Sequence, residues 1–107
     1  MKKIETIEQF EEIVEKNSPV FILKHSLTCP ISQAAYDEYE KFSLENETIA
    51  TYFIAIQEAR PLSNYIAEKY HIKHESPQAI LFSDEQPVWN DSHRQITDVS
   101  LTKALQF

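Results

Sequence analysis

The chain has 107 residues, of which 42% are hydrophobic and 25% are charged, and its formal net charge is −7. This composition predicts one globular domain over residues 1–107, and the acidic charge argues against nucleic acid as a partner, because nucleic-acid binders need a basic face. A single cysteine excludes an internal disulfide framework, and the lack of glycine excludes the glycine-rich loops that hold nucleotide phosphates.

The first residues do not resemble a signal peptide, since two lysines are followed by acidic residues rather than by an apolar stretch. No apolar run approaches the roughly 20 residues that a membrane-spanning helix needs. We therefore expect a cytoplasmic protein without a membrane partner.

The hydrophobic pattern predicts four helices and four strands. Thr6 and Gln9 have capping-box spacing at the start of a helix over residues 6–16, and residues 20–24 form an apolar strand buried on both faces. The later elements are a helix over residues 30–44, a strand over 49–57, a helix from Pro61, strands over 79–82 and 88–90 around a turn at 83–87, and a helix over 97–106. The predicted order is therefore αβαβαββα.

Cys29 lies between the apolar strand and the helix that Pro30 begins. Unpaired N–H groups and the positive end of the macrodipole at a helix start favour thiolate over thiol. This placement predicts a nucleophile for disulfide exchange. The alternative is a small buried cysteine that fills the core. We expect no metal site, because one cysteine supplies too few soft ligands.

Three neighbours of Cys29 are further candidates for the site. Ser32 follows one helical turn later, so its hydroxyl could donate to the thiolate, although it could equally be helix filler. Thr28 is either a residue at the strand end or a second donor. Pro30 is expected to fix the backbone of the first helical turn.

Residues 24–32, with the sequence Lys-His-Ser-Leu-Thr-Cys-Pro-Ile-Ser, resemble the site of the monothiol bacilliredoxin family. The order of elements and the Ser76-Pro77 pair before the hairpin resemble the thioredoxin-like fold. The resemblance implies an α/β fold with a four-stranded mixed sheet flanked by helices. It also implies a stress-response oxidoreductase that uses Cys29 to remove the small thiol bacillithiol from protein mixed disulfides.

In this family picture, bacillithiol is a co-substrate rather than a permanently bound cofactor, and bacillithiolated proteins are the partners of a monomer. Ser32 stands where dithiol relatives carry a second cysteine, so an intramolecular disulfide cycle is impossible. The resemblance further implies that the Ser76–Pro77 peptide bond is cis and that Pro77 faces Cys29. The backbone of Ser76 would then pair with the substrate.

Bacillithiol carries carboxylates on a malate group, which favour cationic side chains or N–H donors as ligands. Lys24, His25 and Arg94 are the candidates, and Arg60 lies at the start of a helix near them in the predicted order. The alternative is that these residues are solvated surface charges.

Other features favour simpler interpretations, and two other functions stay open. His71 and His74 have the spacing of a metal pair but fit a surface loop better, and Trp89 and Tyr36 fit packing roles. One alternative function is an iron–sulfur carrier of the monothiol glutaredoxin type, in which one cysteine and a small thiol from each of two subunits complete four ligands. The other is a non-catalytic interaction module with an inert thiol.

Overall fold

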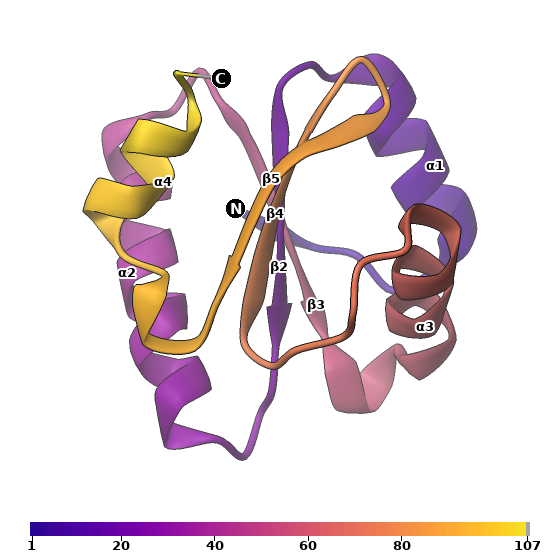
Figure 1. The fold of residues 1–107 in the computed structure, drawn as a ribbon, viewed down its shortest axis with the longest axis horizontal. Coiled ribbons are helices and arrows are strands. Elements are labelled where there is room, and N and C mark those ends of the chain that lie inside the picture. Colours follow the sequence, from indigo (N-terminus) through magenta and orange to yellow (C-terminus); the bar gives the residue numbers. More distant parts are fainter. Residues whose placement is uncertain (107) are drawn as a thin grey trace.

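The computed structural model describes residues 1–106. Its five-stranded sheet has the strand order β1-β3-β2-β4-β5 and lies between two pairs of helices, α1 with α3 and α2 with α4 (Figure 1). The strands are β1 (Lys2–Lys3), β2 (Val20–His25), β3 (Ala50–Ala55), β4 (Gln78–Ser83) and β5 (Gln86–Ser92). The helices are α1 (Ile7–Lys16), α2 (Pro30–Glu45), α3 (Arg60–Tyr70) and α4 (Asp98–Ala104), with short 3-10 turns η1 (Ile56–Glu58) and η2 (His93–Gln95).

The fifth strand, β1, corrects the prediction of a four-stranded sheet. Lys2 and Lys3 pair in parallel with Tyr52 and Phe53 of β3. Both lysines are exposed, so the strand lacks the apolar residues that reveal a strand in a sequence. Its pairing partner is also far away in the chain, which local patterns cannot show.

Two elements end before their predicted last residues. β3 ends at Ala55, because its neighbour β2 ends opposite it at His25 and offers no further partner. The chain continues as η1 instead of extending the strand to residue 57. The last helix ends at Ala104 rather than at residue 106.

The predicted helix starts are confirmed. Thr6 and Gln9 form both hydrogen bonds of a capping box at the start of α1, and Thr97 caps α4. Pro30 stands at the first position of α2, where its missing N–H leaves no intrahelical bond unmade.

The sheet contains both parallel and antiparallel strand pairs, and several strands and helices begin or end together at one end of it. β2 pairs in parallel with β3 and antiparallel with β4, so β2 and β3 end where β4 begins. We call this end of the sheet, marked by His25, Ala55 and Gln78, the site edge. α2 and α3 begin at the site edge, and β5 ends there opposite Gln78.

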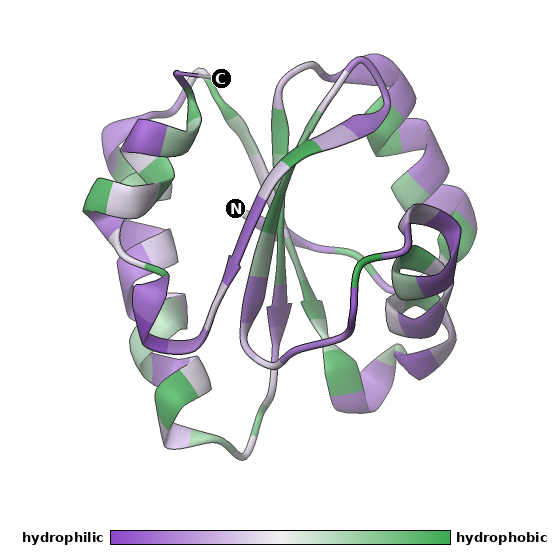
Figure 2. Ribbon diagram, viewed as in Figure 1, coloured by the Kyte–Doolittle hydropathy of each residue, from purple (hydrophilic) through white to green (hydrophobic). Residues whose placement is uncertain are grey.

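The core has two halves, one on each face of the sheet. Along β2, Val20 and Ile22 pack under α1 and α3, while Phe21 and Leu23 pack under α2 and α4. Hydrophobic residues accordingly dominate the inner strands, and polar residues cover the outer faces of the helices (Figure 2). Trp89 packs edge-on against Phe21 at a ring-centroid distance of 6.1 Å, as its predicted packing role requires.

None of the helices between residues 1 and 106 is both long and apolar enough to cross a membrane.

Helix α2 is fixed to the sheet by Tyr39, whose ring is fully buried. Its hydroxyl donates to the Tyr52 carbonyl at 2.7 Å and accepts from the Tyr52 N–H at 3.2 Å. Tyr39→Phe leaves both backbone groups without this partner, so we expect the free energy of unfolding to fall by about 1–3 kcal/mol in urea denaturation. The control is Tyr52→Phe, whose hydroxyl makes no hydrogen bond within residues 1–106. Equal stability losses in the two variants would contradict this role.

Candidate active site

Cys29 lies at the site edge, at the N-cap of α2, and is partly exposed. A short loop, residues 26–28, connects it to β2. Gln57 of η1 holds this loop from the neighbouring strand, donating to the Ser26 hydroxyl at 2.9 Å and accepting from the Leu27 N–H at 3.1 Å. The sequence analysis missed Gln57. One feature of the sequence could have indicated Gln57: it follows the carboxyl end of a predicted strand. If that strand is parallel to β2, the carboxyl ends of both strands meet at one edge of the sheet.

The start of α2 lowers the pKa of the Cys29 thiol below its usual value. The largest cause is the backbone N–H of Ser32. Burial is the second largest and opposes it, and the backbone N–H of Ile31 and the Ser32 hydroxyl then add to the lowering of the pKa. The neutral thiol makes no capping hydrogen bond to residues 30–33, so these donors act on the thiolate. The first turn of α2 carries no acidic side chain that would counteract them.

The neighbours of Cys29 have different environments. Ser32 is fully buried, and its hydroxyl accepts from the Ser26 N–H at 3.3 Å, so it also connects the loop to the helix. Thr28 and Pro30 are exposed. Because β2 ends at His25, Thr28 lies in a turn and not at a strand end, which corrects one of its two interpretations.

The Ser76–Pro77 peptide bond is cis and lies at the same edge. Lys24 pairs with Gln78 across β2 and β4, so the register places Pro77 opposite the end of β2, four residues before Cys29. The Pro77 carbonyl accepts from the His93 N–H at 3.0 Å. This bond connects the proline to η2, on the far side of the hairpin.

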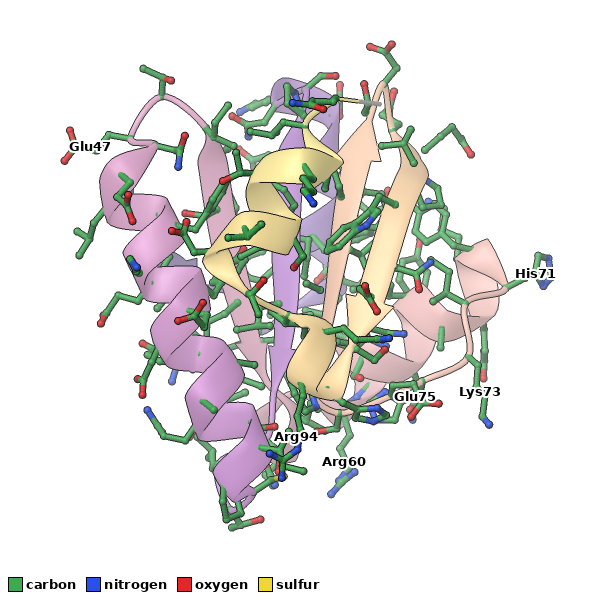
Figure 3. All side chains as sticks on the ribbon, turned by 60° about the vertical axis from the view of Figure 1, so that its left-hand side comes forward. Glu47, Arg60, His71, Lys73, Glu75 and Arg94 are labelled. Atoms are coloured by element: carbon green, nitrogen blue, oxygen red, sulfur yellow. The ribbon has the colours of Figure 1, made fainter. Side chains whose placement is uncertain are left out.

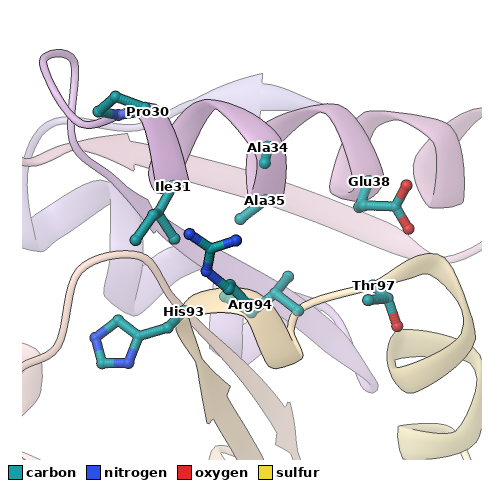
Figure 4. A pocket seen from close by; sticks show the side chains of 9 residues that line it. Pro30, Ile31, Ala34, Ala35, Glu38, His93, Arg94 and Thr97 are labelled. Carbon is teal, nitrogen blue, oxygen red and sulfur yellow. The ribbon is translucent and has the colours of Figure 1, made fainter.

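A groove of about 370 Å³ runs beside the first two turns of α2 and is closed on its other side by η2 and the start of α4. Pro30 and Ile31, which directly follow Cys29, lie at one end of it. The exposed Arg94 extends from η2 toward α2, between Ile31 and Ala35 (Figure 4). The groove therefore joins the thiol to a cationic side chain.

Both arginines of the chain, Arg60 and Arg94, are exposed at the end of the molecule where α2 begins, and Glu47 lies at the opposite end (Figure 3). Within residues 1–106, no carboxylate lies within 4 Å of either guanidinium, whereas Lys3, Lys16 and Lys69 all form ion pairs. The site edge thus offers two guanidinium groups that can bind an external anion.

Lys24 does not lie at this surface, which corrects its prediction as a carboxylate ligand. Its side chain is fully buried on the α3 side of the sheet. The ammonium donates to the Ser63 carbonyl at 3.0 Å and lies 3.3 Å from His74 Nδ1. Burial lowers its pKa to about 8.

His25 is buried on the opposite face and is also corrected as a surface cation. It is 6% exposed, and its ring lies against Tyr36 at a centroid distance of 4.8 Å. Burial lowers the pKa of His25 below its usual value, partly opposed by the Ser32 backbone and by the charge of Asp37. The imidazole is therefore neutral at pH 7. Both corrections share one cause: all six residues of β2 are covered.

The two histidines considered as a metal pair have separate environments. His71 ends α3 in the left-handed region at φ 55° and is exposed, while His74 faces Lys24. Between residues 1 and 106 no group of three or more histidine, cysteine, aspartate or glutamate side chains has the arrangement of a metal site.

Comparisons with known proteins agree with this geometry. Residues 2–101 match the family described as monothiol bacilliredoxin BrxC. A solved thioredoxin-fold protein, described as a candidate oxidoreductase, is 48% identical with a TM-score of 0.92, covering 96% of this chain and 91% of its own.

Thioredoxins from Trypanosoma brucei brucei and Plasmodium falciparum superpose with TM-scores of 0.79 and 0.80 at 14% and 15% identity. The matches cover 97% and 99% of this chain, and 86% and 97% of the two thioredoxins. At that identity the likeness concerns the fold alone, and it confirms the predicted thioredoxin-like α/β architecture.

The donors around Cys29 predict its reactivity. We expect iodoacetamide to alkylate Cys29 with a pH midpoint below about 8.5, the value of an ordinary cysteine. Ser32→Ala removes only the hydroxyl and leaves the dominant N–H, so its midpoint is expected to rise by less than about one pH unit. Ser18→Ala, at the other end of β2, is the matched control. A midpoint at or above the ordinary value in the unmodified protein would refute the activation of this thiol.

Proposed function

The chain belongs to the monothiol bacilliredoxin family and is a thioredoxin-fold oxidoreductase, and from this membership we propose that it removes bacillithiol from protein mixed disulfides through Cys29. The observation that carries the proposal is one thiol, activated at the start of α2, in a chain that has no second cysteine. Such a thiol can take up a small thiol from a disulfide but cannot release it by itself.

The proposed reaction has two exchange steps. The Cys29 thiolate first attacks the bacillithiol sulfur of the mixed disulfide; a disulfide forms between Cys29 and bacillithiol, and the client cysteine leaves as a thiolate. A second small thiol, as its thiolate, then attacks the same bacillithiol sulfur and releases Cys29 as a thiolate. The mixed or symmetric disulfide of small thiols carries away the oxidising equivalents, so Cys29 is unchanged at the end.

Two features support recognition of a bacillithiolated client, one for the small thiol and one for the client chain. Its malate carboxylates match the guanidinium groups of Arg94, in the groove beside α2, and Arg60. Arg60 replaces Lys24 in this proposal, because the Lys24 ammonium is buried. The backbone of Ser76, next to the cis bond, is proposed to pair with the extended chain of the client.

The direct test is the mass of the protein after incubation with a bacillithiolated client. We expect one bacillithiol adduct on the unmodified protein and none on Cys29→Ala, because only the thiolate can accept the group. The client must lose the same mass. An equal adduct on Cys29→Ala, or no adduct on either protein, would reject the proposal.

The same preparation tests the two alternatives from the sequence. Anaerobic reconstitution with iron, sulfide and bacillithiol is expected to leave a colourless monomer; a coloured dimer would favour the iron–sulfur carrier. An alkylation rate no faster than that of a free thiol would favour the non-catalytic module.

The assignment of Arg94 gives a separate prediction. Arg94→Gln removes a charge-assisted hydrogen bond to the bacillithiol carboxylate, so KM for the bacillithiolated client is expected to rise about tenfold. The rate of iodoacetamide alkylation should not change, because Arg94 is not among the groups that act on the Cys29 thiol. Lys103→Gln, in the last turn of α4, is the matched control for loss of a cation. An unchanged KM in Arg94→Gln would remove this residue from the site.

A further inference from the structure

Lys24 is the one cation among the fully buried side chains of residues 1–106. None of the ion pairs within these residues includes it, and its Nζ contacts only the Ser63 carbonyl and His74 Nδ1. An apolar residue would fill the same space without burying a charge, and buried charges without a carboxylate are costly. The contacts of Lys24 therefore call for an explanation beyond packing.

The contact with His74 holds the segment that leads to the cis-proline, residues 71–77, which we call the connector, while the contact with the Ser63 carbonyl ties the ammonium to α3. His74 lies in the connector, three residues before Pro77. Gln78, the cross-strand partner of Lys24, donates from its own buried side chain to the Lys73 carbonyl at 3.0 Å. Two paired side chains of the sheet thus hold adjacent residues of the connector.

The connector is held from the other face of the sheet as well. His93 N–H donates to the Pro77 carbonyl, and His93 Nε2 lies 3.2 Å from a Glu75 oxygen. Lys24 and Gln78 act from the α3 side, and His93 acts from η2. The position of Ser76 between these attachments is therefore set by both faces together.

We propose that Lys24 is a positioning residue for disulfide exchange: its buried ammonium holds the connector through His74 and so fixes the Ser76 backbone against the substrate. This inference rests on the proposed function in one respect only, because the proposed function supplies the substrate that the Ser76 backbone binds. Lys24 is not among the groups that lower the pKa of Cys29, so the reactivity of the thiol itself is independent of it.

The contact also makes recognition dependent on pH. His74 accepts from Lys24 only while Nδ1 is unprotonated. Burial, and next the charge of Lys24, lowers the pKa of His74 below its usual value; Arg60 acts in the same direction and Glu75 against it. As pH falls through this lowered pKa, an N–H appears on Nδ1 and two cations face each other, so the connector loses this attachment.

The test compares two rate constants at each pH. Exchange with a bacillithiolated client requires the connector, whereas alkylation by iodoacetamide, a small neutral reagent, requires only the thiolate. Both rate constants depend in the same way on the folded fraction of the protein and on the ionised fraction of Cys29. Their ratio therefore needs no correction for either quantity and reports the positioning step. We expect Lys24→Met to lower the ratio about tenfold at pH 7.5, since misplaced reacting groups cost factors of this size or more.

Variants of His74 supply the rescue. The unmodified protein is expected to show a ratio that declines below about pH 6.5. His74→Asn keeps an acceptor that does not titrate, so its ratio should be retained at pH 7.5 and should lack this decline. His74→Phe should behave like Lys24→Met. Because the His74 side chain is exposed on its outer side, this variant keeps the test valid if Lys24→Met does not fold. Ile80→Val, a buried change on the same face, is the control.

Hydrogen exchange gives a readout that does not depend on the proposed function. The His93 amide, bound to the Pro77 carbonyl, is expected to lose protection about tenfold in Lys24→Met and not in Ile80→Val. Unchanged protection of this amide would overturn the inference, as would an unchanged exchange ratio in Lys24→Met. If the unmodified protein forms no bacillithiol adduct, the proposed function fails and the amide protection alone decides the role of Lys24.

Discussion

The complete burial of β2 is the constraint on which the rest of the structure depends. The strand is paired on both edges and covered by helices on both faces. The chain can therefore reach solvent only where β2 ends, and Cys29 comes four residues after that point. The same burial places Lys24 and His25 on opposite faces of the sheet. Neither can serve as a surface cation, although both lie within five residues of the reactive thiol.

Much of the fold and the centre of the site could be predicted from local patterns. Three features depend only on neighbouring residues and can therefore be recognised in the sequence: the capping box at Thr6, Pro30 at a helix start, and the apolar run before Cys29. The short β1 and the loop contacts of Gln57 depend on which strands become neighbours. The burial of Lys24 has the same non-local origin. A lysine in a sequence does not by itself indicate whether its side chain is exposed or buried.

The distribution of charge separates the site edge from the rest of the molecule. The chain carries a net charge of −7, yet both of its arginines lie at the site edge. An anionic ligand is repelled by the acidic remainder and attracted to the two guanidinium groups over a distance of about 10 Å at moderate salt. Local charge at the edge thus matters more for such a ligand than the overall acidity.

Reactivity and recognition in this protein have different structural origins. The thiolate of Cys29 is stabilised by atoms within one turn of α2, chiefly the Ser32 N–H. The cis-proline segment is instead held by Lys24 and His93, from elements distant in the sequence. In the proposed reaction, a chain without a resolving cysteine must admit two partners in succession, the mixed disulfide of the client and then the second small thiol. An activated sulfur alone would react with any disulfide that reached it. Selection between these partners must therefore come from the cis-proline segment and the residues distant in the sequence that hold it.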